Sequence, residues 1–358
     1  MKVFRNQDED FEEVYEDEEI DEIERIKARK KFRDLKPENR RRRKEPPKPW
    51  GKKERLLVLF IFIATILIAT FLSLGSINWK VSGLPRIKIP SLNFWQEETI
   101  ILGGDKNNPN RLEIEKSERA ISSFKNLTDK LSGLYAFYVI KLDSGFIFGV
   151  NDKEKMEAAS LMKLPVLAAL YLESEKGTLN LETKYSLKNS DKKAGAGSLV
   201  SKPAGTLITY REMARLMGKE SDNTAFGIIR NIVGETKIDE VMKKFGMTDS
   251  SLSDFETTPQ DIGIFFEKLW QGKIISIKSR DEILNYLTGT IYENWLVAGI
   301  PNVRIAHKYG RELHVVNDAG IVFDDKPFVL VIMSDGVVER EADGIFPELA
   351  KVIYQETR

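Results

Sequence analysis

Residues 134–150 read LYAFYVIKLDSGFIFGV and indicate how the folded part of this chain begins. Leu134 to Leu142 is rich in aromatic and β-branched residues, which favour an extended strand. Asp143-Ser144-Gly145 is a turn sequence, and Phe146 to Val150 returns as a second strand. The stretch therefore predicts a β-hairpin, the first part of a sheet.

Further strands are expected only near the C-terminus, at 304–308, 313–322 and 328–333. Between and around the strands, apolar residues recur at helical spacing. The expected helices cover 113–130, 161–174, 210–218, 223–233, 238–245, 259–271 and 347–355. This order predicts an α/β (α+β) fold: an antiparallel five-stranded sheet flanked by helices, with an all-helical subdomain inserted. Because the sheet takes strands from both ends, we expect residues 113–358 to form one domain.

Composition excludes several kinds of site. The chain has 358 residues, no cysteine and only two histidines, His307 and His314. Disulfides, thiol nucleophiles and cysteine-based metal sites are therefore absent, and a histidine-rich zinc site is not expected. A Ser-His-Asp triad would have to use one of these two histidines. We expect neither a metal nor a cofactor.

The N-terminal part has a different character. Leu56 to Leu74 reads LLVLFIFIATILIATFLSL, nineteen residues without a charge. As a helix it would be about 28 Å long, close to the roughly 30 Å hydrocarbon core of a bilayer. Lysine and arginine are concentrated before it, at 25–55, which places the N-terminus in the cytoplasm. We therefore expect a single transmembrane anchor at 55–76, which contacts lipid through 56–74.

The expected organisation follows from this anchor. Residues 1–54 would be a charged, disordered cytoplasmic tail, 77–112 an extracytoplasmic linker, and 113–358 an extracytoplasmic domain on a bacterial cell membrane. The basic run before the anchor is better explained by anionic lipid than by nucleic acid. A long segment before the apolar run favours an uncleaved anchor over a signal peptide. Cleavage near Ser73-Leu74-Gly75 is the second interpretation.

Ser160-Leu161-Met162-Lys163 opens the helix expected at 161–174. Residues three apart on a helix share a face, so the Lys163 amine could take the proton of Ser160. The alternative for Ser160 is a helix cap. Lys163 has apolar neighbours, and burial lowers the pKa of a lysine, which would make it a base. This tetrad alone is a weak signal.

Two further segments have the right order to complete such a site. Ser221-Asp222-Asn223 precedes the helix at 223–233, and its alternative is capping of that helix by Asp222 or Asn223. Lys308-Tyr309-Gly310 ends an expected strand, and its alternative is an exposed edge lysine before a turn glycine. Each alternative is common when its motif stands alone. The order and separation of all three motifs favour an acyl-transfer site.

The sequence here resembles the penicillin-recognising serine hydrolases, most closely the class A β-lactamase family, whose motifs are S-x-x-K, S-D-N and K-T-G. The similarity extends over about 115–358 and includes Leu207 to Ala214, Thr257-Thr258-Pro259, His307-Lys308 and Asn317 to Val322. The resemblance implies a nucleophile at Ser160, a base at Lys163 and a proton relay through Ser221. It also implies an orienting role for Asn223, substrate attraction by Lys308, substrate binding at 309–311, and an oxyanion hole from the backbone N–H groups of Ser160 and Arg311.

Two departures from the family bear on function. Tyr309 stands where the family has a short hydroxyl that helps to bind a substrate carboxylate. Arg311 could replace that contact, and Tyr309 could instead be a packed wall residue. The family also has a glutamate in E-x-x-L-N that activates the deacylating water. Residues 246–256 read GMTDSSLSDFE and contain no such motif; Asp254 and Glu256 are expected to close a turn or cap a helix.

Three functions remain open at this point. The first is a β-lactamase-like serine hydrolase that forms a Ser160 acyl-enzyme with β-lactams and deacylates slowly. The second is a D,D-peptidase or transpeptidase whose partner is a peptidoglycan stem peptide. The third is a cell-wall-binding or sensor protein without turnover, although binding alone does not require a poised base. The sequence does not indicate an oligomeric state.

Overall fold

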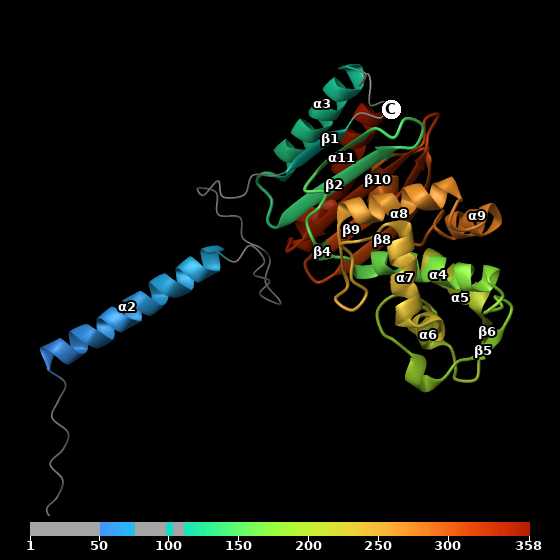
Figure 1. The fold of residues 1–358 in the computed structure, drawn as a ribbon, viewed down its shortest axis with the longest axis horizontal. Coiled ribbons are helices and arrows are strands. Elements are labelled where there is room, and N and C mark those ends of the chain that lie inside the picture. The colour runs from blue at the N-terminus through green and yellow to red at the C-terminus, as the bar shows by residue number, and fades with distance from the viewer. Residues whose placement is uncertain (1–50, 76–97, 103–110) are drawn as a thin grey trace, which may run out of the picture. The chain divides into compact units, whose positions relative to one another are not determined.

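The computed structural model describes residues 51–75, 98–102 and 111–358 (Figure 1). The chain divides into two compact units, Met1–Trp79 and Lys80–Arg358. In the first unit, α2 (Lys52–Gly75) contains the apolar run, and its described apolar side chains are exposed. Within the described residues, no helix is long and apolar enough to cross a membrane, so the transmembrane prediction is not confirmed. The predicted tail up to residue 50 lies outside the described residues.

The second unit is built on one antiparallel sheet with the strand order β1-β3-β2-β10-β9-β8. Its strands are β1 (Thr99–Leu102), β2 (Leu134–Lys141), β3 (Ile147–Val150), β8 (Arg304–Glu312), β9 (Val315–Phe323) and β10 (Phe328–Asp335). The predicted hairpin is present as β2 and β3, with the Lys141 N–H donating to the Phe146 carbonyl at 2.9 Å. β2 pairs with β10, so the two ends of the domain meet at the centre of the sheet.

The sheet has six strands, so the prediction of five is wrong. The extra strand, β1, lies inside the expected linker at 77–112 and pairs with β3 from Thr99↔Val150 to Leu102↔Ile147. β1 is only four residues long, too short for a periodic pattern to be read from sequence. Its place depends on the free edge that β3 offers. The rest of the expected linker falls mainly outside the described residues.

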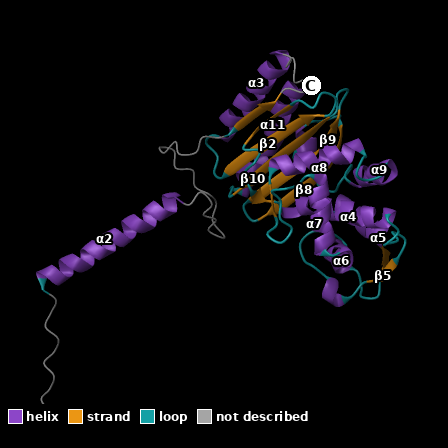
Figure 2. Cartoon of the chain, in the orientation of Figure 1, coloured by secondary structure: helices purple, strands orange, loops and turns teal. Residues whose placement is uncertain are grey.

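Two helices cover one face of the sheet (Figure 2). They are α3 (Arg111–Thr128) and α11 (Glu339–Thr357), which contact each other. Phe124 of α3 lies 4.7 Å from Phe137 of β2 between ring centroids, in the core of this face. The expected C-terminal helix is thus present, but it begins at Glu339 and includes Pro347.

The other face carries α8 (Pro259–Gln271) and leads into the helical subdomain (Figure 1). The close fit of α8 depends on Gly263, where an added Cβ would lie 2.4 Å from the ring of Tyr138 in β2. A second hydrophobic core continues from this face into the subdomain. Its helices are α4 (Lys163–Glu175), α5 (Tyr210–Lys219), α6 (Asn223–Val233), α7 (Glu235–Phe245) and α9 (Ile277–Tyr286).

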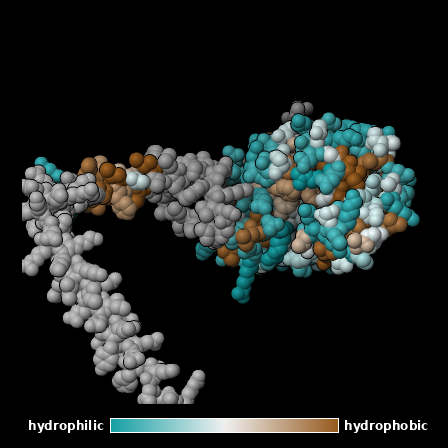
Figure 3. All heavy atoms as spheres, turned by 90° about the horizontal axis from the view of Figure 1, so that it is seen from below, coloured by the Kyte–Doolittle hydropathy of each residue, from teal (hydrophilic) through white to brown (hydrophobic). Residues whose placement is uncertain are grey.

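Short elements complete the domain and were not predicted. They are α9, α10 (Leu296–Gly299) and the two-stranded pairs β4 (Met156–Glu157) with β7 (Glu256–Thr257) and β5 (Lys184–Ser186) with β6 (Leu207–Thr209). The visible face of the domain is largely polar, whereas the described part of α2 is apolar (Figure 3). The β4–β7 pair matters for the site because it joins the residues just before Ser160 to the segment before α8.

Candidate active site

Ser160 lies in a short 3₁₀ helix, Ala159–Met162, that leads directly into α4. Neither helix start has a side-chain cap bond, so the capping interpretation of Ser160 is wrong. Ala159 has a φ of +46°, a left-handed conformation that is costly for a non-glycine residue. The surrounding packing therefore holds the backbone beside Ser160 in a strained shape, which fixes where the hydroxyl points.

Lys163 connects two of the three motifs. Its Nζ donates to Ser160 Oγ at 2.6 Å and to Asn223 Oδ1 at 2.8 Å. The side chain is buried, and burial lowers the pKa of Lys163 to about 8, against the opposing effect of Asp222 and Glu312. An amine with this pKa is partly neutral near neutral pH and can act as a base toward the serine it contacts.

The three residues of the Ser221-Asp222-Asn223 motif have different structural roles. Asp222 caps α6 by accepting the Ala225 N–H at 2.8 Å, as the capping alternative predicted. Ser221 is fully buried with a φ of +56°, another left-handed turn. Asn223 does not cap the helix, because its Oδ1 accepts from Lys163 while its Nδ2 donates to the Ala194 carbonyl at 3.0 Å.

The segment 194–199 lies against this turn. The Asn223 N–H donates to the Ala196 carbonyl at 3.0 Å, and the Leu199 N–H donates to Asp222 Oδ2 at 2.8 Å. At Gly197, which has a φ of +101°, an added Cβ would lie 2.1 Å from Asp222 Oδ2. Only glycine permits this approach, so the segment borders the site as a fixed wall.

Lys308 connects the third motif to the second. It is fully buried, so the alternative interpretation of Lys308 as an exposed edge lysine is wrong. Its Nζ donates to Ser221 Oγ at 3.0 Å and to the Tyr309 carbonyl at 2.6 Å. Burial, with a contribution from Lys163, lowers the pKa of Lys308 well below that of a free lysine. The structure therefore brings the five predicted side chains together in two hydrogen-bonded groups, Asn223–Lys163–Ser160 and Lys308–Ser221.

The strand β8 passes close to Ser160. It was predicted to end at the Lys308-Tyr309-Gly310 motif, but it continues to Glu312. An added Cβ at Gly310 would lie 3.1 Å from the Ser160 backbone nitrogen, so glycine permits this approach. β8 is an edge strand, and its His307 N–H points away from β9 to the Leu287 carbonyl. By the two-residue repeat of a strand, the Arg311 N–H also points away from β9. The oxyanion hole expected from the N–H groups of Ser160 and Arg311 stays a prediction.

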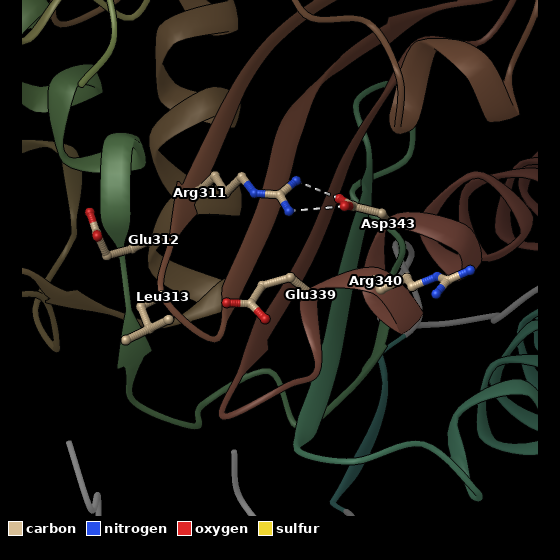
Figure 4. A pocket seen from close by; sticks show the side chains of 6 residues that line it. All are labelled: Arg311, Glu312, Leu313, Glu339, Arg340 and Asp343. Atoms are coloured by element: carbon tan, nitrogen blue, oxygen red, sulfur yellow. Dashed lines mark hydrogen bonds and ion pairs between the residues drawn. The ribbon is translucent and has the colours of Figure 1, made fainter. Parts of the chain in front are cut away.

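The side chains of Tyr309 and Arg311 both contact other residues of the protein. Tyr309 is only 9% exposed, and its ring lies 5.3 Å from that of Tyr292. Burial raises the pKa of Tyr309 to about 12, assisted by the charges of Glu220 and Asp318. The Arg311 guanidinium makes two bonds to Asp343 of α11, at 2.7 and 2.9 Å (Figure 4). Tyr309 is thus a packed wall residue, as the alternative interpretation of this position proposed.

A hollow of about 670 Å³ lies beside Arg311, and Figure 4 shows the side chains that line it. Its other lining residues are Glu312, Leu313, Glu339, Arg340 and Asp343. Ser160, Lys163 and Ser221 do not line it. We therefore assign the chemistry to the hydrogen-bonded groups and not to this hollow.

The segment 246–258 connects α7 to α8 and contains three carboxylates. Asp254 accepts from Ser251 Oγ at 2.6 Å and closes a turn, as predicted, and Glu256 belongs to β7. The carboxylates that raise the pKa of Lys163 are Asp222 and Glu312, and both lie outside this segment.

The histidines do not form a triad with Ser160. His307 Nδ1 is 2.7 Å from Asp318 Oδ1, and its Nε2 is 3.2 Å from Thr290 Oγ1, all of them buried. His314 Nδ1 is 2.9 Å from the Val337 carbonyl. No group of metal-ligating side chains occurs among the described residues.

The profile of the Beta-lactamase enzyme family matches residues 119–357. The chain belongs to this family. Among curated relatives, the β-lactamase CARB-3 of Pseudomonas aeruginosa is 23% identical over 204 residues, which cover 51% of this chain and 70% of that protein. The β-lactamase VEB-1 of the same organism is 24% identical over 176 residues and is covered to 51%.

Solved structures agree with the family assignment. A β-lactamase from Sphaerobacter thermophilus has a TM-score of 0.64 at 22% identity, covering 67% of this chain and 97% of its own. The structure of PBP-A has a TM-score of 0.61 at 25% identity, covering 69% and 95%. These results confirm the resemblance to the β-lactamase and D,D-peptidase superfamily. As a member of the Beta-lactamase enzyme family, the chain is a serine hydrolase that acts on amide bonds.

Several contributors to the family site were missed from sequence. Tyr292 supports Tyr309, and Glu220 accepts the Ser198 N–H at 3.0 Å beside the Ser221 turn. Glu312 acts on Lys163 from the end of β8. None has a local sequence signal, because each reaches the site only through the folding of distant segments.

Proposed function

We propose that this protein forms an acyl-enzyme at Ser160 with β-lactams and releases the acyl group slowly. The observation that carries the proposal is the hydrogen-bonded set Asn223–Lys163–Ser160, with Lys308–Ser221 beside it. Binding without chemistry would not require a buried lysine in contact with a serine hydroxyl, because burying that amine is costly.

The chemical steps follow from the contacts. The neutral Lys163 amine takes the proton of Ser160 Oγ as this oxygen forms a bond to the carbonyl carbon of the lactam. The negative charge on the carbonyl oxygen is stabilised by the backbone N–H groups of Ser160 and Arg311. The C–N bond then breaks, and Ser221 gives its proton to the leaving nitrogen, replaced through its bond to Lys308. The product is an ester between Ser160 and the acyl group.

Release of that ester requires a water and a base. The segment 246–258 contributes no carboxylate that acts on Lys163, and its Asp254 is used in a turn. Lys163 contacts Ser160 and Asn223, and it holds the proton that it took from Ser160 during acylation. It must lose this proton before it can accept one from the attacking water, and this requirement supports a long-lived acyl-enzyme.

A D,D-peptidase or transpeptidase acting on a peptidoglycan stem peptide is the second candidate. The same missing carboxylate favours it, since a transpeptidase passes the acyl group to an amine and needs no dedicated hydrolytic base. A mutant of PBP-A, 24% identical with a TM-score of 0.60, was solved as an acyl-enzyme complex with penicillin G. This similarity supports a stable acyl-enzyme as a chemical possibility of the fold.

We also propose that the domain is displayed outside a bacterial membrane, on an anchor formed by residues 56–74. The support is the uncharged nineteen-residue run, the basic residues before it and the exposure of its described apolar side chains. Fractionation of cells that produce the full chain tests this. Recovery in the soluble fraction, without a detergent requirement, would overturn it.

One experiment tests the acyl-enzyme proposal. The full chain is incubated with penicillin G while intact mass and drug concentration are followed together. We expect one acyl group per protein, retained for minutes or longer, and none in Ser160→Ala. Ser144→Ala, which removes a hydroxyl from the β2–β3 turn, is the matched control and should label normally.

Three outcomes would change the assignment. Rapid continued drug loss with no accumulated adduct would replace slow release by true hydrolytic turnover. Transfer of the acyl group to an added D-amino acid would establish the peptidase alternative. Absence of any adduct would overturn the proposal and favour a wall-binding or sensor protein.

A further inference from the structure

The two lysines of the motifs, and the arginine that follows the third motif, are engaged by the protein itself. Lys163 donates to Ser160 and Asn223. Lys308 donates to Ser221 and to the Tyr309 carbonyl. The Arg311 guanidinium is paired with Asp343 on α11. An anionic group on a substrate would have to break one of these arrangements to bind Lys163, Lys308 or Arg311.

The ring of Tyr309 covers Lys308. Its centroid lies 4.0 Å from Lys308 Nζ, and the lysine has no exposed surface. The Tyr309 ring packs against other aromatic rings. The Tyr292 centroid lies 5.3 Å from that of Tyr309 and 4.7 Å from that of Trp295. Trp295 is buried and packs on Phe346 of α11. Removing the ring from Lys308 therefore requires disturbing a packed aromatic group.

Two carboxylates, Glu312 and Glu220, act electrostatically on this region. Glu312 is close enough to raise the pKa of Lys163, and Glu220 is close enough to raise that of Tyr309. Glu220 is fixed by the Ser198 N–H at 3.0 Å. A carboxylate on the substrate would meet repulsion from both, with no free guanidinium or ammonium from the three motifs to offset it.

We propose that Tyr309 is a specificity-determining residue that closes Lys308 to substrate anions. The site then takes amides whose neighbouring group is neutral or cationic in preference to amides that carry a carboxylate there. This inference rests on the proposed acyl-transfer function and names its substrate class. A short side chain at 309 would expose the ammonium, and a charge-assisted contact with a substrate anion would become available.

Penicillin G and its methyl ester test the proposal, because they differ at the carboxylate and share the lactam. The rate of Ser160 labelling is measured for each with the full chain and divided by the rate of reaction with hydroxide. We expect the ester to label the wild-type protein at least as fast as the acid. In Tyr309→Thr, the acid should gain about tenfold, as expected for one charge-assisted contact, while the ester changes little.

Tyr309→Phe is the matched control, since it keeps the ring over Lys308 and removes only the hydroxyl. It should retain the wild-type preference for the ester. The inference is overturned if the wild type labels with the acid more than about tenfold faster than with the ester, or if Tyr309→Thr changes both rates equally. Absence of labelling by both compounds overturns the proposed function instead. If Tyr309→Thr does not fold, the wild-type preference decides.

Discussion

The two serine–lysine groups and the segment 246–258 belong to one domain but differ in where their polar groups find hydrogen-bond partners. In the first, side chains from three distant segments meet at 2.6–3.0 Å and are buried or nearly so. In the second, polar groups bond within the segment or to the start of α8, as when Asp254 accepts from Ser251 and Asp261 of α8 accepts from Ser250.

The difference teaches which half of an acyl-transfer cycle this fold supports by itself. Forming an ester needs a nucleophile, a base and a proton donor in contact, and helices and an edge strand fix all three. Breaking the ester needs a further base beside a water. The short connection between α7 and α8 has no E-x-x-L-N glutamate, and its Asp254 accepts a hydrogen bond from Ser251 in a turn.

The largest effect is expected from Lys163→Ala. Removing the base should slow Ser160 labelling by about 10³-fold, within the range of general-base contributions. Burst kinetics with penicillin G measure it. Lys176→Ala, which removes an exposed lysine just beyond α4, is the control and should label normally. Labelling of Lys163→Ala within tenfold of wild type would mean that the serine–lysine contact is structural.

The pH profile of labelling should show the next largest effect. Lys163 acts as a base only when deprotonated, and its pKa is about 8. The rate should therefore rise about tenfold per unit from pH 6 and level off above pH 8. Asn223→Asp should move this profile to higher pH, because a carboxylate beside Lys163 raises its pKa. A flat wild-type profile between pH 6 and 9 would contradict the assignment.

Release of the acyl group tests the other side of the comparison. Hydroxylamine attacks an ester without help from a general base, so it should speed loss of the adduct by about tenfold or more. Mass spectrometry follows the adduct with and without hydroxylamine at equal ionic strength. Equal and rapid release in both would show that the protein already supplies a deacylating base.

The smallest effects are expected at the wall of the site. Gly197→Ala combines left-handed strain with a Cβ placed 2.1 Å from Asp222 Oδ2, whereas Gly205→Ala has a φ of +87° and open space. Both should lower stability by about 1 kcal/mol or more through strain. Only Gly197→Ala should also slow labelling, by a few-fold, because it displaces the Ser221 turn. Thermal unfolding and labelling rates separate the two.

Much of this fold could be predicted because local patterns agree with tertiary placement. Five of the six strands and most of the helices follow from apolar periodicity, and the three motifs follow from their order. β1 was missed because four residues carry no period and depend on the edge of β3. The β4–β7 pair was missed for the same reason. α9 is as long as α5, which was predicted, and it was missed because its sequence has few apolar residues at helical spacing.

The sequence by itself determined which groups are available: a serine and lysine three residues apart, a Ser-Asp-Asn turn, a strand lysine, and no E-x-x-L-N glutamate. The tertiary structure alone decided how they are used. It buried Lys308, covered it with Tyr309 and paired Arg311 with Asp343. The physical reason is that spacing along a chain fixes neighbours within a helix or strand, whereas burial and charge pairing depend on segments that are distant in the sequence.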